Sequence, residues 1–234
     1  MTQAPPKPQR SAVTPAEALF IVVVCFGWAI LGSTQSVAAW GQPARAVGAR
    51  AAAVASTGIT NAGLLSIVVT ELVLSAVALA FLAWRRYDIP GLSPQPTPRG
   101  LVVGVALYAA GTLAFWLLTA VLNSGTAQEP IGAMVRDASV SVGIVVFMAV
   151  VNGAYEEIFL LGVLGRGLRG FGQSIAVGVP LLVRLLYHTY QGPVAASAVC
   201  LIGMVWGFHH FRSQALFPVV FAHVIADVVP FVWH

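Results

Sequence analysis

Charged side chains are scarce in this chain. Asp, Glu, Lys and Arg make up 9% of the 234 residues, whereas hydrophobic residues make up 58%, and the mean hydropathy is +0.86. A soluble domain usually carries about a quarter charged residues. Several apolar runs also exceed the ~18 residues needed to cross a bilayer. The composition therefore excludes an ordinary soluble domain and predicts an integral membrane protein.

Cysteine is also scarce, and the excess of positive charge is small. Cys25 and Cys200 each lie in an apolar segment, and two isolated thiols predict buried small side chains rather than a disulfide or a metal site. The formal net charge of +4 comes from arginines that mostly flank apolar runs, as membrane topology requires. The lipid bilayer accounts for this charge, and no nucleic-acid partner is expected.

The apolar runs predict an all-α fold, a polytopic transmembrane helical bundle of about seven spans. Residues 1–14 are rich in proline and polar groups and are expected to form a disordered tail. We expect residues 15–137 to supply scaffold spans and residues 138–234 to form the core, within one membrane domain. The predicted spans cover residues 16–40, 59–84, 100–122, 138–165, 173–190, 193–209 and 214–233.

Basic residues between the predicted spans indicate an orientation. Eight of them fall on the side of the N-terminus and three on the other side, which favours a cytoplasmic N-terminus. The compact chain suggests a bacterial plasma membrane. The eight are Lys7, Arg10, Arg85, Arg86, Arg99, Arg166, Arg169 and Arg212, and the three are Arg45, Arg50 and Arg136.

Ionisable side chains inside predicted spans are concentrated near the C-terminus. Such groups are costly in a bilayer and by default mark functional or paired sites. Three pairs of polar residues are spaced four apart, so each pair shares one helix face. These pairs are Asn152 with Glu156, Arg184 with His188, and His223 with Asp227. Because lipid offers no partners, we expect the three polar stripes to face one another.

A cluster of this composition can hydrolyse an amide. A carboxylate beside an imidazole can deprotonate a water molecule, and a second histidine can donate a hydrogen bond to the oxyanion that forms. Glu156 and Glu157 are adjacent in a dry setting, so they are expected to titrate as a coupled pair in which one is an acid and the other a base.

The stretches "EEIFLLG", "RLLYHTYQGP" and "AHVIADVVPF" resemble the membrane-embedded family of type II CAAX prenyl endopeptidases and bacteriocin-processing proteins. The signature of that family is a double glutamate, a lone histidine on a later helix, and a final His-x-x-x-Asn/Asp. The resemblance covers residues 138–234. It implies a glutamate-dependent intramembrane protease that acts on a membrane-associated peptide or protein without an obligatory metal or other cofactor.

The same resemblance implies roles for individual residues. Glu156 would be the base that activates water, and His188 would help to position it or share its proton. His223 and Asp227 would stabilise the oxyanion, while Glu157 would orient its neighbours and hold the helices together. Asp227 stands where eukaryotic-type enzymes have Asn, and it could orient His223 by accepting its ring N–H.

One position departs from the family pattern. Leu161 stands where relatives often have an arginine, five residues after the first glutamate. Arg184, one turn before His188, could supply the missing guanidinium from a facing helix. Asn152 is interpreted as a supporting residue that forms a hydrogen bond between packed helices.

Other polar residues and other functions stay open at this point. Glu71 is interpreted as a packing or water-facing residue, and His209 and His210 are expected in a short solvated loop with Arg212. A non-catalytic immunity or partner subunit could retain the site as a binding pocket. A zinc hydrolase could use Glu156, His188 and His223 as ligands, although the motif H-E-x-x-H is absent. The sequence gives neither the substrate, including whether it is prenylated, nor the oligomeric state.

Overall fold

The computed structural model describes residues 10–40, 59–122, 135 and 138–233. All of the regular structure in these ranges is helical, which confirms the predicted all-α bundle. The first helix is continuous from α1 (Pro15–Ile21) through the π-helical segment η1 (Val22–Phe26) into α2 (Gly27–Trp40). The remaining long helices are α4 (Asn61–Trp84), α5 (Pro98–Val121), α7 (Val142–Glu157) with its π-helical extension η3 (Ile158–Gly165), α8 (Gln173–His188), α9 (Pro193–Ser213) and α10 (Phe217–Val232).

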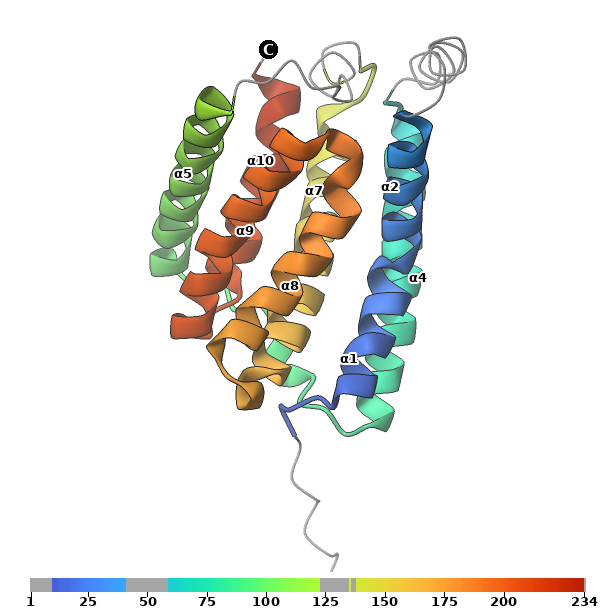
Figure 1. Cartoon of the computed structure of the whole chain (residues 1–234), viewed down its shortest axis with the longest axis vertical. Helices are drawn as coiled ribbons and strands as arrows, with labels where there is room; N and C mark the ends of the chain where they lie inside the picture. Colours follow the sequence, from blue (N-terminus) through green and yellow to red (C-terminus); the bar gives the residue numbers. More distant parts are fainter. Residues whose placement is uncertain (1–9, 41–58, 123–134, 136–137, 234) are drawn as a thin grey trace, which may run out of the picture.

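In the part of the chain that the structure describes, the long helices match the predicted spans in number and order. Five of them have the length and hydropathy of a membrane-crossing helix, which is consistent with an integral membrane protein. Helix α10 is apolar but shorter, and the 16-residue α8 carries Arg184 and His188. Successive helices run in alternating directions, so α1 begins at one end of the bundle and α10 ends at the other (Figure 1).

Several helix boundaries follow from local sequence. Thr60 and Thr97 cap α4 and α5 by accepting hydrogen bonds from backbone N–H groups of the first turn. Gly172 and Gly192 have φ near +95° (96° and 94°) immediately before α8 and α9, a conformation that favours glycine. These two glycines allow the short turns that bring α8 back along α7 and α9 back along α8.

The tail and one loop differ from the predictions. Residues 1–9 of the predicted tail lie outside the described residues. Arg10, by contrast, forms an ion pair with Glu17, and Val13 is buried, so this end of the tail is part of the fold. His209 and His210 do not lie in a solvated loop, because α9 continues to Ser213 and ends only where Gln214 adopts a left-handed conformation.

The described arginines other than Arg184 flank helix ends at one end of the bundle. Figure 1 shows that this is the end at which α1 begins, α4 ends, α5 begins and α9 ends. There Arg166 Nη2 lies 2.5 Å from Asp88 Oδ2, and its hydrogen bond lowers the pKa of the Asp88 carboxyl group. These arginines are Arg10, Arg85, Arg86, Arg99, Arg166, Arg169 and Arg212.

Helix α10 is held at the centre of the C-terminal helices. It packs against both α5 and α7, and glycines permit the close approach. A Cβ atom on Gly104 of α5 would lie 2.9 Å from the carbonyl oxygen of Pro218, and one on Gly153 of α7 would lie 3.3 Å from Cβ of His223. The small residue Gly153 therefore lets the backbone that carries His223 come close to α7.

The two π-helical segments, η1 and η3, each contact a tyrosine from a distant part of the chain. In a π-helix the hydrogen bonds run from i to i+5, and such segments are frequent at functional sites. Carbonyl groups within them accept hydrogen bonds from distant tyrosines: Cys25 accepts from Tyr155, and Gly162 accepts from Tyr87 over 3.1 Å. The N-terminal helix and the loop after α4 are thereby tied to α7 and η3.

Candidate active site

The buried side chain of Glu157 connects three helices. Its contacts with Arg184 and His223 are called the buried junction below. Its side chain is fully buried, and its Oε1 accepts hydrogen bonds from Arg184 Nη2 on α8 at 2.5 Å and from His223 Nδ1 on α10 at 2.7 Å. A buried carboxylate needs such partners, because removing it from water without them costs several kcal/mol (about 3–5 when one partner of a buried pair is lost). Glu157 therefore fixes α7, α8 and α10 relative to one another.

Glu156 faces a different direction from its neighbour. Adjacent helical residues project about 100° apart, and Glu156 lines a cavity rather than the buried junction. Its Oε2 accepts a hydrogen bond from the hydroxyl group of Tyr187 and lies 3.9 Å from His223 Nε2. Among the described residues, its Oε1 has no hydrogen-bond donor. This carboxylate is thus held in place while one oxygen is available to a ligand.

His223 links the two glutamates. Its Nδ1 contacts Glu157, so its Nε2 faces the cavity, 3.9 Å from Glu156 Oε2 and 3.6 Å from Asp227 Oδ1. Asp227 Oδ2 in turn accepts a hydrogen bond of 2.9 Å from Asn152 Nδ2. A separation of 3.6 Å is too long for a hydrogen bond, so Glu157, rather than Asp227 as the sequence suggested, orients the ring of His223.

Arg184 reaches the junction from α8, which places a guanidinium beside Glu157 although position 161 is Leu. Leu161 itself is buried in the apolar core. The guanidinium also lies over the ring of Trp206, with 5.6 Å to the ring centroid, and the same ring lies 5.5 Å from that of His223. Trp206 therefore packs against both partners of Glu157.

His188 lies on the cavity wall and not at the junction. It is the last residue of α8, and its Nδ1 is 2.9 Å from the carbonyl oxygen of Arg184. A carbonyl can only accept, so Nδ1 carries the proton and Nε2 is the acceptor of a neutral ring. Tyr187 and Tyr190 flank this ring, with centroid distances of 4.4 and 6.4 Å. No hydrogen bond joins His188 to Glu156 among the described residues.

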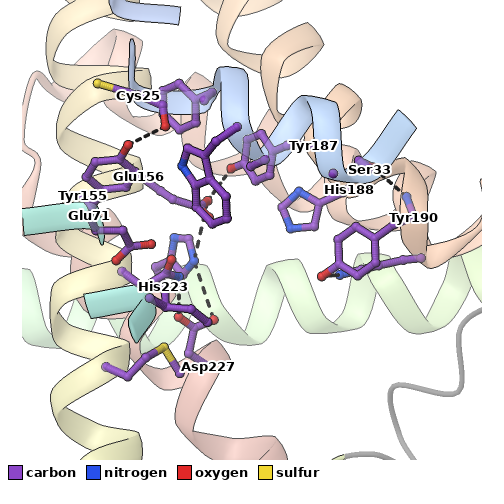
Figure 2. Close-up of a pocket in the computed structure, with 18 of the residues that line it drawn as sticks. Cys25, Ser33, Glu71, Tyr155, Glu156, Tyr187, His188, Tyr190, His223 and Asp227 are labelled. Atoms are coloured by element: carbon purple, nitrogen blue, oxygen red, sulfur yellow. Dashed lines mark hydrogen bonds and ion pairs between the residues drawn. The ribbon is translucent and has the colours of Figure 1, made fainter. Parts of the chain in front are cut away.

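The cavity has a volume of about 470 Å³, within the ~300–1,000 Å³ usual for ligand sites. The sequence placed the N-terminal spans outside the site, but they form one wall of it. Ser33 on α2 fixes part of that wall, because its Oγ contacts Thr189 Oγ1 at 2.7 Å and accepts from the backbone N–H of Tyr190 at 2.8 Å. Figure 2 shows how the side chains surround the cavity. Its polar lining residues are Ser33, Glu71, Asn152, Tyr155, Glu156, Tyr187, His188, Tyr190, Gln191, His223 and Asp227.

Two residues of this site were missed or undervalued in the sequence. Tyr187 donates to Glu156, and the available signal was its place directly before His188 and one turn after Arg184. Glu71 has no ionisable neighbour one turn away in the sequence, so only the packing of α4 against α7 brings it to the cavity. Pairs spaced by four residues find polar stripes but cannot find single residues that face the same space from another helix.

Among the described residues, the group of side chains that could hold a metal differs from the triad considered in the sequence. Ligand atoms of Glu156, Glu157 and His223 lie within 4.8 Å of one another, whereas His188 is not in this group. Oε1 of Glu157 already receives the Arg184 guanidinium at 2.5 Å. A cation placed there would be repelled by Arg184 and would compete with it for the carboxylate, so this donor set does not fit a zinc ion well.

On the hydrolytic function expected from the sequence, replacing Tyr187 with phenylalanine is expected to reduce the rate about tenfold or more, because a hydrogen bond to a charged group is worth about 1.5–3 kcal/mol and this one holds the carboxylate of Glu156. The change should appear in kcat rather than in KM. Tyr108→Phe, on α5 and outside the cavity, is the matched control and should keep wild-type kinetics. Equal kcat values for Tyr187→Phe and the wild type would show that the hydroxyl group has no positioning role.

Comparison with known proteins relates part of the chain to a described family. Residues 138–229 match the protein-family model described as "Type II CAAX prenyl endopeptidase Rce1-like". This confirms the resemblance inferred from the motifs and covers the helices that carry the double glutamate, His188 and His223. No curated protein and no solved structure matches the chain significantly. The Rce1-like family is a protease family, so residues 138–229 are similar at the family level to CAAX-type intramembrane peptidases.

Proposed function

We propose that this Rce1-like chain is an intramembrane endopeptidase that hydrolyses a membrane-associated peptide or protein at Glu156. One observation carries the proposal. The carboxylate of Glu156 faces a cavity of about 470 Å³ inside a helical bundle, with Nε2 of a histidine 3.9 Å away. A base, a histidine and space for a peptide are the parts that amide hydrolysis needs.

In the proposed reaction, Glu156 removes a proton from a water molecule that is bound at its cavity-facing oxygen. The water oxygen forms a bond to the carbonyl carbon of the substrate, and the carbonyl π-electrons move to its oxygen. Tyr187 keeps the carboxylate in position through its hydroxyl group. When the tetrahedral intermediate collapses, the C–N bond breaks and the leaving amine takes the proton from Glu156. Glu156 is then the carboxylate again.

The proposed oxyanion donor is Nε2–H of protonated His223. Its Nδ1–H is engaged by Glu157 at 2.7 Å, and its Nε2 faces the carboxyl groups of Glu156 and Asp227 at 3.9 and 3.6 Å. A preorganised donor of this kind typically contributes 10²–10³-fold to the rate (about 2.7–4 kcal/mol). Asn152 Nδ2 donates a hydrogen bond of 2.9 Å to Asp227 Oδ2, which holds the carboxyl group of Asp227 near Nε2 of His223. We assign to His188, on the cavity wall, the positioning of water or substrate.

The test of this function is the accumulation of an uncleaved precursor. Membrane proteomes of cells with the wild-type gene, without it, and with Glu156→Ala are compared by mass spectrometry of protein termini. We expect the deletion and Glu156→Ala strains to accumulate the same uncleaved peptide or protein. Accumulation in the deletion strain alone would mean that the chain is needed as a non-catalytic subunit and that Glu156 is not its base.

Metal removal is expected to leave hydrolysis unchanged. The cation that balances Glu157 is already Arg184, so the proposed mechanism needs no further Lewis acid. The purified protein is dialysed against a strong chelator, its metal content is measured, and its rate is compared before and after zinc is restored. A rate that falls with the metal content and returns with zinc would replace this mechanism with a zinc-dependent one.

We also propose that the protein lies in a bacterial plasma membrane with its N-terminus on the cytoplasmic side. The seven described arginines that flank one end of the bundle support this orientation. The cavity includes Tyr190 and Gln191, which follow α8 at the opposite end of the bundle. Reporter fusions at both termini test the orientation, and an external N-terminus would contradict it.

A further inference from the structure

Glu71 is a buried carboxyl group for which the described residues provide no hydrogen-bond partner at Oε2. Its side chain lies on α4 with 3% of the residue exposed, and its Oε2 is shielded from solvent and has no hydrogen-bond partner. The other two fully or nearly buried glutamates of the described chain, Glu17 and Glu157, each receive an arginine. An unpaired buried carboxylate is costly and in a membrane span is a functional candidate.

The carboxyl group of Glu71 points into the cavity of the proposed reaction site. Glu71 lines the same cavity as Glu156 and Asp227. Figure 2 shows its oxygens turned toward His223 at the centre of the cavity. The N-terminal half of the chain thus contributes an acid to a site whose other acids come from α7 and α10.

The cavity lining contains more acidic than basic side chains. Three carboxyl groups line it, whereas none of its described lining residues is lysine or arginine. Arg184 is not part of the cavity lining, because it is buried at the junction against Glu157 at 2.5 Å. Even with His223 protonated, the acids outnumber the cations. A ligand that brings a positive charge would relieve the repulsion between these carboxylates.

Aromatic rings supply the second feature of this cavity. Their faces attract cations, most strongly when water is excluded. A cavity lined by both aromatic rings and carboxyl groups suits an amine or guanidinium group on an apolar stem, such as the side chain of lysine or arginine. The rings that line the cavity belong to Phe26, Trp28, Tyr155, Tyr187, Tyr190 and Phe231.

We propose that this cavity binds a basic side chain, Lys or Arg, of the substrate beside the scissile bond, and that Glu71 is the specificity-determining residue that pairs with it. The cleavage part of this assignment rests on the proposed peptidase function, whereas the binding part does not. A C-terminal carboxylate close to the scissile bond would meet three acids, so an internal basic position is favoured over a free acidic chain end.

Binding is tested with small probes and does not require catalysis. Butylguanidinium chloride mimics an arginine side chain, and butylurea is its uncharged counterpart of the same shape. The thermal unfolding midpoint of the purified full chain in detergent is titrated with each probe at matched ionic strength. We expect butylguanidinium to raise the midpoint with an apparent Kd at least about tenfold lower than that of butylurea, a ratio that corresponds to 1.4 kcal/mol.

Variants assign this preference to Glu71. Glu71→Gln keeps the size of the side chain and should remove the difference between the two probes. Asp88→Asn is the matched control, since it also removes one carboxylate but lies outside the cavity in an ion pair with Arg166, and it should bind as the wild type does. Equal affinity of the wild type for both probes, or an unchanged preference in Glu71→Gln, would overturn the proposal. The wild-type comparison decides the matter even if Glu71→Gln does not fold.

Cleavage of a degenerate peptide library, read by mass spectrometry, then separates the two proposals. We expect Lys or Arg to be enriched at one position beside the cleaved bond in the products of the wild type, and we expect this enrichment to be lost in the products of Glu71→Gln. Cleavage by the wild type without this enrichment would overturn the basic-residue assignment and leave the peptidase intact. Glu71-dependent binding of butylguanidinium without cleavage of any peptide would support the cation site and count against the peptidase.

Discussion

Replacing Glu156 with glutamine is expected to lower kcat by about 10²–10⁴-fold, the usual contribution of a general acid–base residue. The amide of glutamine cannot take a proton from water, but it has nearly the same shape and its oxygen can still accept the hydrogen bond from Tyr187. Substrate affinity should therefore change little. The measurement is single-turnover cleavage of a precursor identified from the membrane proteomes, with purified wild-type and variant proteins.

The Glu156→Gln result has meaning only if the variant is folded. The buried junction does not involve this side chain, because Arg184 contacts Glu157, so the unfolding midpoint should stay close to that of the wild type. Cleavage at the wild-type rate by a folded variant would remove Glu156 from the mechanism. It would then favour a binding or partner role for the chain.

Removing Arg184 is expected to have the largest effect on stability. Arg184→Met leaves Glu157 buried with its charge uncompensated by a guanidinium, and loss of one partner from such a pair typically costs about 3–5 kcal/mol. Nη2 lies 2.5 Å from Oε1 and both side chains are almost fully buried, whereas His223 Nδ1 stays as the second partner of Oε1 at 2.7 Å, so we expect a loss within this range. The free energy of unfolding is measured in mixed micelles by titration with a denaturing detergent.

A double variant distinguishes the charge from the packing. Glu157→Gln combined with Arg184→Met removes both charges, so it should recover much of the stability lost in Arg184→Met alone. It should not recover activity, because the hydrogen bond from His223 Nδ1 would then meet an amide without negative charge. If Arg184→Met is as stable as the wild type, Glu157 has another compensating partner and the junction does not depend on this ion pair.

Much of the architecture could be predicted from single segments. The apolar lengths located the helices within a few residues, for example residues 173–190 for α8 (Gln173–His188) and residues 214–233 for α10 (Phe217–Val232). This works because each membrane helix satisfies its own backbone hydrogen bonds, so its length is a local property. The boundary at His209 and His210 was wrong because a polar pair near a helix end resembles a loop, whereas a left-handed residue at Gln214 sets the end of α9.

The candidate site could be predicted only in part. Helical spacing put His223 and Asp227 on one face, and the structure brings that face beside Glu156. Spacing could not show that Glu157 rather than Asp227 orients His223, because that depends on the rotation of α7 and α10 about their axes. It also could not show that Glu71 and Tyr187 reach the same cavity.

By itself, the sequence determined that this is a membrane protein of about seven helices with its ionisable stripes near the C-terminus, and that its motifs are Rce1-like. Composition and helical period carry that information because they act within one segment. Only the tertiary structure decided how the two adjacent acids differ: Glu157 is neutralised by Arg184, and Glu156 faces the cavity. Only the packing of α4 against α7 could bring Glu71 there, since contacts between segments far apart in the chain leave no periodic trace in either one.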